Sequence, residues 1–309
     1  MAGIQSKLLP WLRLVRVGTL FSPGCDVLAG AAIAAAAVAK QPELTLPGIP
    51  VLARAALASI AVYAAGMVFN DVADRQEDRL QRPERPLPRG DISLVGALAL
   101  GALLIGLALL CSPVPSHHAL LAALALAYDF VLKRNRALAA LTMGTLRGAN
   151  LGTAGLLLIA PSSGAGNAAL TSPALGAALL AACICYGIYI SFVTILGILE
   201  DATQPRRGLV LLVQSVPPLA ALTGITIVSN GPGVASLLAA ALLLAFFVRM
   251  LRVPSWDRRS IRGSMTWLLL GTMCYTALLA AGAGSLALGL GIAACIVPAR
   301  RLSRWISLT

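Results

Sequence analysis

The chain has 309 residues, of which 58% are hydrophobic and 12% are charged, and its formal net charge is +12. These proportions exclude a soluble globular protein and are typical of a polytopic, all-α membrane protein. The positive charge does not predict a nucleic-acid partner, because the basic residues lie in short connections between apolar segments, where they set membrane orientation.

Ten apolar runs approach the roughly 17 to 25 residues that a helix needs to cross a bilayer. They cover residues 17–39, 49–70, 91–111, 116–132, 137–160, 173–198, 208–229, 232–252, 264–281 and 284–299. Of the 24 Lys and Arg residues, 21 lie in alternate connections, which places the N-terminus and every basic loop in the cytoplasm. The last two runs are short, so the chain either has nine spans or turns back near Gly282–Gly284 to make a tenth. We expect one domain over residues 1–309.

A dense polar block, NDVADRQEDRLQRPERPLPRG, follows the second run at residues 70–90 and holds five of the twelve acidic residues. If the preceding helix continues through it, four residues share one helix face. They are Asn70, Asp71, Asp74 and Asp78. Clustered carboxylates at a membrane surface favour Mg²⁺, held by oxygen ligands and shared with a phosphate-bearing substrate. Three prolines then end the helix, and arginines such as Arg85 bring cations to the same loop. The alternative is a solvated loop whose charges only set topology.

This block resembles the first aspartate-rich motif of the UbiA superfamily of intramembrane prenyltransferases. The family pattern is NDxxDxxxD followed by RPxRPLPxG, and every fixed position of it is present. The resemblance implies a bundle of about nine transmembrane helices around a central cavity. It also implies Mg²⁺-dependent transfer of a prenyl group from an isoprenyl diphosphate to a small, often aromatic, acceptor.

Two polar elements come next in the chain. His117 and His118 follow SPVPS on the side away from the aspartate block, and we interpret them as loop residues without a ligand role. The string AYDFVLKR looks like the family element in which a Tyr and a Lys-Arg pair lie near the diphosphate, here Tyr128, Lys133 and Arg134. The alternative for Arg134 is a basic anchor at the membrane interface.

Arg147 lies well inside an apolar run, in MGTLRGANLGTAG, with Asn150 three residues later. A charge at that depth is expensive unless it faces a cavity or a partner, so we predict a pocket residue. The rival interpretation is a structural ion pair with Asp26 or Asp129. Asp26 itself is either a hydrogen-bond acceptor in the pocket or a helix-start residue after Pro23 and Gly24.

Tyr186 and Tyr189 lie one turn apart on the sixth run. Their ring faces can stabilise an allylic cation, or the two side chains can be ordinary interface aromatics. Nearby Cys183 and Cys185 point to different sides of a helix, so we interpret them as core residues and not as metal ligands.

The loop after the sixth run departs from the family pattern. Aligning its basic pair and Gly with the family's DxxxD element places the two family Asp positions on Glu200 and Gln204. Glu200 and Asp201 remain available as metal ligands, but the amide of Gln204 is a weaker ligand for Mg²⁺.

The resemblance therefore implies a complete site. Its catalytic residues are Asp71, Asp74, Asp78, Lys133 and Arg147; its substrate-binding residues are Asn70, Arg85, Tyr128, Arg134, Asn150, Tyr186 and Tyr189; and its Mg²⁺ ligands are Asn70, Asp71, Asp74, Asp78, Glu200 and Asp201. The site loops are expected on the cytoplasmic side of a bacterial-type inner membrane, with lipid around the helices.

Three alternatives stay open. MGTLRGAN, the reduced acidity of ILEDATQPRRG and the basic tail look more like EboC-type UbiA-like proteins, associated with metabolite prenylation or export, than like ubiquinone or menaquinone enzymes. A second reading is a lipid-modifying transferase with another donor, such as a phosphoribosyl diphosphate. A third is a transporter or non-catalytic scaffold that kept one metal motif.

Overall fold

The computed structural model describes residues 2–39, 47–159, 173–200, 206–253 and 255–308, and every regular element in these ranges is a helix. The first half contains α1 (Ala2–Leu14), η1 (Val17–Thr19), α2 (Phe21–Val38), α3 (Ile49–Ala73), α4 (Arg75–Gln81), α5 (Pro86–Arg89), α6 (Leu94–Cys111), α7 (Pro115–Phe130), η2 (Leu132–Arg134), α8 (Arg136–Leu151) and α9 (Thr153–Ile159). The second half contains α10 (Pro173–Glu200), α11 (Arg207–Val228), α12 (Val234–Leu251), α13 (Arg258–Gly282), α14 (Leu286–Ala294) and α15 (Ile296–Leu308).

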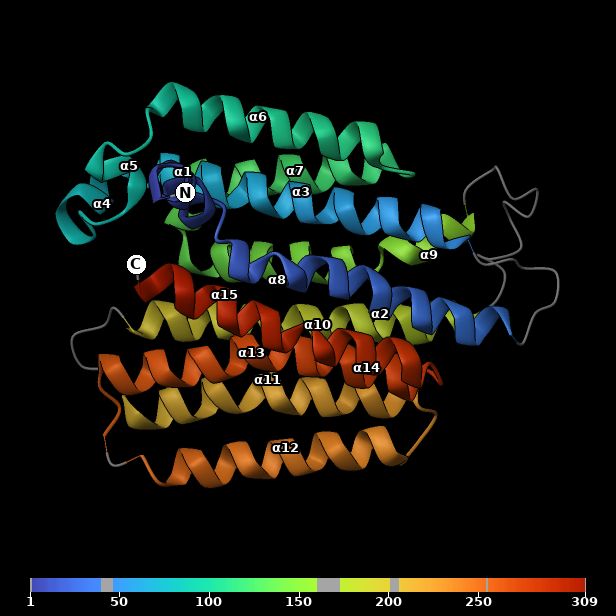
Figure 1. The fold of residues 1–309 in the computed structure, drawn as a ribbon. Helices are drawn as coiled ribbons and strands as arrows, with labels where there is room; N and C mark the ends of the chain where they lie inside the picture. The colour runs from blue at the N-terminus through green and yellow to red at the C-terminus, as the bar shows by residue number, and fades with distance from the viewer. Residues whose placement is uncertain (1, 40–46, 160–172, 201–205, 254, 309) are drawn as a thin grey trace.

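The long helices run side by side along one common direction (Figure 1). In the described ranges, eight segments are long and apolar enough to cross a membrane. The 16-residue α7 and the broken pair α8 and α9 are shorter or interrupted, but they lie parallel to the others. The predicted all-α membrane bundle is therefore confirmed.

The end of the chain turns back as the alternative to nine spans predicted. Gly284 adopts φ 91°, a left-handed conformation that favours glycine, and it lies between α13 and α14. From there, residues 286–306 run back through the bundle as one membrane-length segment bent at Cys295. The basic C-terminal end thus lies at the same end of the bundle as α4 and α5 (Figure 1).

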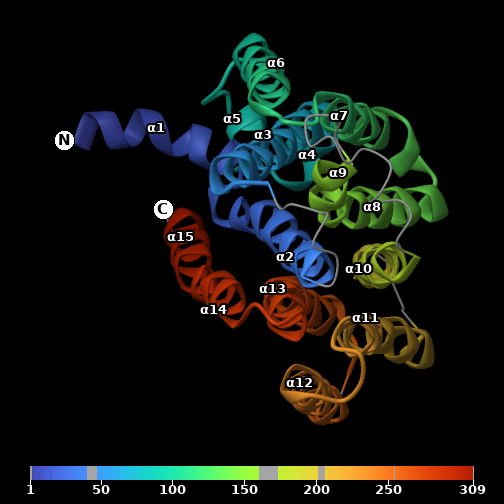
Figure 2. The same cartoon turned by 90° about the vertical axis from the view of Figure 1, so that its right-hand side faces the viewer.

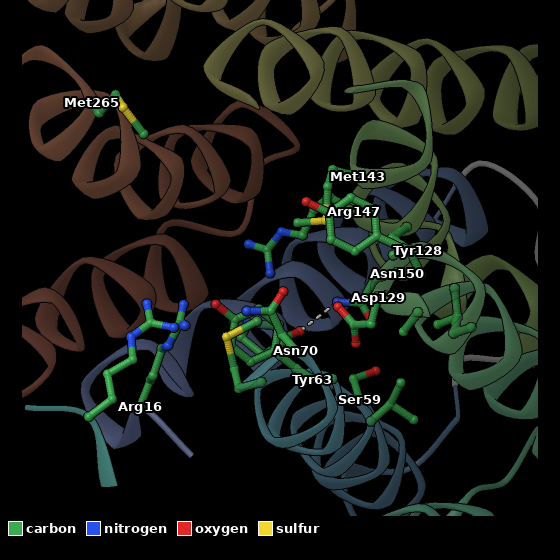
Figure 3. A pocket seen from close by; sticks show the side chains of 18 of the residues that line it. Arg16, Ser59, Tyr63, Asn70, Tyr128, Asp129, Met143, Arg147, Asn150 and Met265 are labelled. Atoms are coloured by element: carbon green, nitrogen blue, oxygen red, sulfur yellow. Dashed lines mark hydrogen bonds between the residues drawn. The ribbon is translucent and has the colours of Figure 1, made fainter. Parts of the chain in front are cut away.

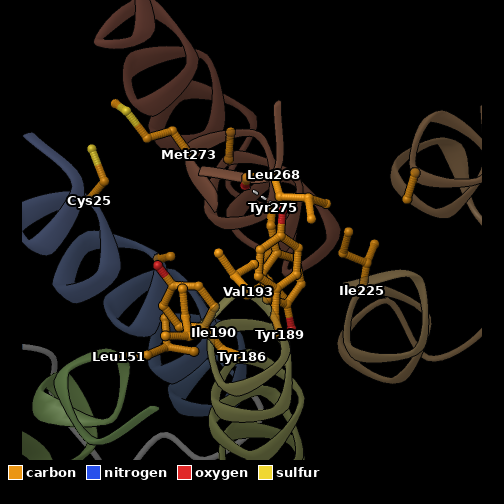
Figure 4. Close-up of a cluster of buried hydrophobic side chains, with 14 of the residues drawn as sticks. Cys25, Leu151, Tyr186, Tyr189, Ile190, Val193, Ile225, Leu268, Met273 and Tyr275 are labelled. Atoms are coloured by element: carbon orange, nitrogen blue, oxygen red, sulfur yellow. Dashed lines mark hydrogen bonds between the residues drawn. The ribbon is translucent and has the colours of Figure 1, made fainter. Parts of the chain in front are cut away.

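Figure 2 views the bundle along its helices. The largest hydrophobic core joins α2, α10, α11 and α13, with aromatic side chains from α10 and α13 and aliphatic ones from α2 and α11 (Figure 4). Its centre is a tyrosine cluster in which the rings of Tyr189 and Tyr275 stack with centroids 5.9 Å apart and Tyr186 meets Tyr275 edge-on. Smaller clusters hold α3 against α6 and α7.

Glycines let α8 and α10 approach backbone to backbone. A Cβ on Gly148 would lie 2.6 Å from the carbonyl oxygen of Cys183, so only glycine fits there. This contact fixes the face of α8 that carries Arg147.

Local capping sets the helix starts next to the basic loops. Asn135 accepts from the backbone N–H groups of Ala137 and Leu138 at the start of α8. Asp257 accepts from Ser260 N–H at 2.8 Å at the start of α13, and this hydrogen bond holds the pKa of Asp257 below its ordinary value.

Two expectations about local structure were wrong. His117 and His118 lie in the first turn of α7, which begins at Pro115, and not in a loop before it. The fully buried His118 bonds to the hydroxyls of Ser59 and Ser112. The helix through the aspartate block also breaks at Asp74, although backbone hydrogen bonds from Asp74 to Asn70 and from Asp78 to Asp74 continue across the junction.

Candidate active site in the central cavity

A cavity of about 440 Å³ opens between α2, α3, α7 and α8 (Figure 3). Apolar side chains form most of its wall: Val62, Met67, Leu121, Ala125, Met143, Leu146 and Met265. The end next to the aspartate block is polar and is lined by Arg16, Asn70, Arg82, Arg85 and Asp129. The predicted central cavity therefore has a charged mouth at one end and a mostly apolar interior. Its volume is in the range of small-molecule binding sites.

None of the three motif aspartates lines the cavity itself, but two of them lie next to its charged mouth and share one arginine of its lining. Asp71 and Asp78 are 4% and 2% exposed. Arg85 donates to Asp71 Oδ1 at 3.3 Å and to Asp78 Oδ2 at 2.6 Å, and Arg16 donates to Asp71 Oδ1 at 3.0 Å. Because Arg85 bonds to both acids, the predicted closeness of motif acids and loop arginines is correct for these three residues.

Asp74 faces a different partner. Lys133 of η2 donates to Asp74 Oδ1 at 2.5 Å and to Asn70 Oδ1 at 3.3 Å. The break in the helix at Asp74 separates it from the acids that share Arg85. Among the described residues no group of three His, Cys, Asp or Glu side chains is close enough to hold a metal ion as it stands.

The donor set nevertheless fits magnesium. The oxygen ligands at and next to the mouth are the Asn70 amide and the carboxylates of Asp129 and the three motif aspartates, and Mg²⁺ prefers such ligands. Asp129 adds another carboxylate to the cavity wall; it is 4% exposed, and its Oδ2 has no hydrogen-bond partner in the described part of the chain. A buried carboxylate oxygen without a partner is costly, and a cation would satisfy it.

Arg147 both lines the cavity and forms the ion pair that was its rival interpretation. Its guanidinium lies 3.2 Å from the Asp26 carboxylate and donates to Tyr186 Oη at 2.5 Å and to the hydroxyl of Ser22. Asn150 Nδ2 donates to Asp26 Oδ2 at 3.0 Å. The partner is Asp26, not Asp129.

Asp26 is the sixth residue of α2, so the helix-start interpretation of this residue was wrong. It is fully buried and accepts hydrogen bonds from Arg147, Asn150 and Tyr186. Asp26 is therefore a hydrogen-bond acceptor, as one of the two interpretations predicted, but its donors are side chains of the protein.

The interpretation that Tyr186 and Tyr189 present their rings to a substrate was wrong, because it placed both side chains at the cavity. Neither lines the cavity, because both side chains belong to the fully packed aromatic core (Figure 4). Tyr189 donates to Leu268 O at 2.6 Å. Of the tyrosines, the cavity is lined by Tyr128, as predicted, and by Tyr63, whose ring centroid lies 5.9 Å from the Arg147 guanidinium carbon.

The remaining predicted ligands lie apart from the cavity or outside the described residues. Glu200 at the end of α10 accepts from Arg262 Nη2 at 2.7 Å, and Arg258 lies 3.6 Å away. Arg134 is exposed in η2. Asp201 and Gln204 lie outside the residues that the structure describes.

Sequence reasoning missed Arg16, Ser59 and Tyr63 as cavity residues. Arg16 counted only as a topology charge, yet it reaches an acid 55 positions away. Tyr63 lies seven residues before Asn70 in α3, and Ser59 lies four residues before Tyr63, so the three share one helix face. That periodicity was the signal that would have found them.

Comparisons of the sequence with known proteins point to one family of prenyltransferases. The family model described as "UbiA prenyltransferase family" matches residues 27–260. A digeranylgeranylglyceryl phosphate synthase from Methanoculleus marisnigri is 56% identical over 43 residues, which are 14% of this chain and 15% of that protein. A protoheme IX farnesyltransferase from Geobacter sulfurreducens is 44% identical over 101 residues, covering 29% of this chain and 36% of the relative. The matched stretches thus span well under two thirds of either relative.

The fold agrees over a much larger share of the chain. A UbiA homolog from Archaeoglobus fulgidus, solved bound to GPP and Mg²⁺, superimposes with a TM-score of 0.57 at 14% sequence identity. The match covers 90% of this chain and 99% of that one. At this identity the likeness establishes the shared helical architecture.

Proposed function

This chain belongs to the UbiA prenyltransferase family, and on that premise we propose that it transfers a prenyl group from an isoprenyl diphosphate to a small acceptor inside the membrane. Mg²⁺ is the proposed cofactor, and an aromatic ring is the proposed class of acceptor. The whole chain, 1–309, acts as one transmembrane domain. Its charged mouth faces the cytoplasm across a bacterial-type inner membrane, because the basic connections lie at that end.

The charged mouth is the proposed diphosphate site. Asn70, Asp71, Asp74 and Asp78 would hold Mg²⁺, with Asp129 as an additional ligand. When bound, Mg²⁺ supplies Lewis-acid stabilisation of the departing diphosphate. Arg85 and Lys133 pair with these acids and would bind phosphate oxygens, with Tyr128 in the cavity wall. The exposed Arg134, next to Lys133 in η2, is a further proposed phosphate ligand.

The apolar wall is the proposed site of the prenyl chain. In the transfer, the bond between the allylic carbon and the diphosphate oxygen breaks, and its electron pair leaves with the diphosphate. A bond from the acceptor to that carbon forms, and the acceptor loses a proton. Met67, Met143 and Leu146 would exclude water from the electron-poor carbon, which protects it from hydrolysis.

One observation carries this proposal. The three motif aspartates pair with Arg85 and Lys133, and Arg85 lines the mouth of an apolar cavity of about 440 Å³. A loop that only set topology would not bury Asp71 and Asp78 to 4% and 2% exposure. A molecule with an anionic head and a hydrocarbon tail is complementary to the charged mouth and to the apolar interior of the cavity.

The test is Mg²⁺-dependent binding of geranyl diphosphate to the purified protein in nanodiscs. We expect binding by the wild type, loss on chelation with EDTA, and at least roughly tenfold weaker binding by Asp74→Asn, because the amide is a poorer ligand for Mg²⁺. Asp91→Asn is the matched control, since Asp91 lies on the same side but outside the cavity. Binding that ignores both Mg²⁺ and Asp74→Asn would refute the proposal.

The acceptor and the donor length are then identified by product analysis. Membranes containing the protein are incubated with labelled isoprenyl diphosphates of several lengths and a cell extract, and labelled products are identified by mass spectrometry. A parallel incubation supplies labelled phosphoribosyl diphosphate, and a product labelled only there would support the alternative donor. Binding without any product would support the scaffold.

A further inference from the structure

A second cleft lies beside the charged mouth, between η1, α5 and α15. Its volume is about 560 Å³. Four arginines line it: Arg13, Arg16, Arg85 and Arg89. Figure 1 shows α1, α5 and α15 gathered at the end of the bundle that carries the basic loops.

The two ends of the chain close this cleft. Arg13 Nε donates to Ile306 O at 3.2 Å, which ties α1 to α15. A Cβ on Gly18 would lie 2.8 Å from Ser303 N and 2.9 Å from its Cα, so the α15 backbone rests directly on this glycine. Both contacts join residues almost 300 positions apart, so the cleft is a feature of the folded chain and not of a local loop.

Arg16 forms the partition between the cleft and the central cavity. Its backbone is left-handed, with φ 51° and ψ 52°, a conformation that costs a non-glycine residue about 1 kcal/mol or more. The conformation directs its side chain to Asp71, at 3.0 Å. Arg16 and Arg85 are the residues that line both spaces, so a group bound in the cleft would lie next to the proposed diphosphate site.

Two of the four arginines in the cleft are already paired with carboxylates. Arg16 pairs with Asp71, and Arg85 pairs with Asp71 and with Asp78. The cations that the cleft offers to a ligand are therefore Arg13 and Arg89. Arg13 donates to a carbonyl, which carries no net charge. The ion pair of Arg89 with Asp91, at 3.5 Å, joins side chains that are 59% and 28% exposed and is weak.

We propose that this cleft is a second anion site, which binds a phosphate group. Guanidinium groups match phosphate oxygens in bidentate geometry, and basic pockets at the cytoplasmic membrane surface suit phosphate headgroups. The phosphate has two possible sources, an anionic phospholipid headgroup or free pyrophosphate leaving the neighbouring cavity. The second source rests on the proposed function, whereas the site itself does not.

The experiment uses the full chain in nanodiscs and the double variant Arg13→Gln/Arg89→Gln, because neither residue lines the central cavity. Arg136→Gln is the matched control: an exposed arginine at the same end of the bundle and outside both spaces. One arm measures binding of inorganic pyrophosphate in EDTA and neutral phosphatidylcholine. The other counts phosphatidylglycerol molecules retained by the protein in native mass spectrometry.

We expect the double variant to lose roughly tenfold in affinity or retention in one arm, while Arg136→Gln behaves as wild type. The arm that changes identifies the source of the phosphate. Arg89→Gln alone removes an exposed side chain with little risk to folding and should give a partial loss. Equal binding by wild type and both cleft variants in both arms would overturn the proposal. Mg²⁺-dependent geranyl diphosphate binding, measured in parallel, should survive in the double variant; its absence from the wild type would contradict the proposed function and not the cleft.

Discussion

Breaking the ion pair between Asp26 and Arg147 should destabilise the bundle strongly. Arg147 is eleven residues into α8, about 16 Å along the axis at 1.5 Å per residue, which is near the middle of a hydrocarbon layer of about 30 Å. Asp26 is fully buried, and Arg147 is 8% exposed. Removing one member leaves an uncompensated charge there, so Asp26→Asn and Arg147→Gln should each cost about 3 to 5 kcal/mol.

The double variant Asp26→Asn/Arg147→Gln separates the pair from its surroundings. It removes both charges together, so it should cost clearly less than the sum of the two single changes, with a coupling of about 2 kcal/mol or more. Unfolding free energies are measured by titrating sodium dodecyl sulfate into mixed micelles and following helix content. Asp91→Asn is the control, because its exposed pair with Arg89 is worth less than about 1 kcal/mol.

Additive effects, with each single change below about 1 kcal/mol, would refute this reasoning. That result would mean that water or a ligand in the cavity already compensates Arg147. The cavity-facing interpretation of this residue would then be the better one. A large coupling would show that most of its charge is used inside the protein, by Asp26 and by the hydroxyl of Tyr186.

Three other changes test the packing and the site. Gly148→Ala places a Cβ 2.6 Å from Cys183 O and should push α8 from α10, lowering both thermal stability and geranyl diphosphate binding, whereas Gly106→Ala, with open space around it, should do neither. Gln214 is fully buried and neither its amide nitrogen nor its amide oxygen has a partner in the described residues, so Gln214→Leu should raise the unfolding free energy by roughly 1 to 3 kcal/mol; a loss of stability would reveal an unseen partner. Lys133→Met should weaken donor binding by roughly tenfold, and Lys133→Arg should restore much of it, because the contact is charge-assisted; unchanged binding in the methionine variant would remove Lys133 from the site.

Much of the architecture was accessible from the sequence because the membrane imposes a strong, local signal. Apolar run length predicted the segments, and alternating basic connections predicted that the ends of α3 and α7 lie together. The contact of Lys133 with Asp74 bears this out. Even the reversal at Gly284 was one of two stated alternatives.

The pairings inside the bundle were not accessible in the same way. Hydropathy gives no rotation of one helix about its axis, so it could not decide whether Tyr189 faces the cavity or the core. It also gave no reason to join Arg16 with Asp71, because a left-handed backbone at Arg16 is set by the tertiary contacts around η1. His117 and His118 were interpreted as loop residues because they are polar, although they fall inside the apolar run 116–132, and the structure places them in the first turn of α7.

The contacts at the charged mouth have a consequence for how the proposed ligands bind. Arg16 and Arg85 together neutralise Asp71 and Asp78, and Lys133 neutralises Asp74, so each of the three motif acids already has a counter-charge within the chain. If Mg²⁺ bound alone, the acids would turn to the metal and leave the cations unpaired. If a diphosphate bound alone, the cations would turn to the phosphate oxygens and leave the acids unpaired. Binding of either ligand alone therefore leaves partly buried charges unpaired, which is unfavourable by several kcal/mol.

Binding both together avoids this, because the acids turn to the metal while Arg85 and Lys133 turn to phosphate oxygens. We therefore expect Mg²⁺ and isoprenyl diphosphate to bind cooperatively, each raising the affinity for the other by the same factor, as thermodynamic linkage requires. Titrating geranyl diphosphate at several Mg²⁺ concentrations, and the reverse, measures that factor. It should shrink in Asp74→Asn, since the amide no longer needs Lys133 as a counter-charge. Two affinities that are independent of each other would mean that the ion pairs of the mouth stay intact when the ligands bind.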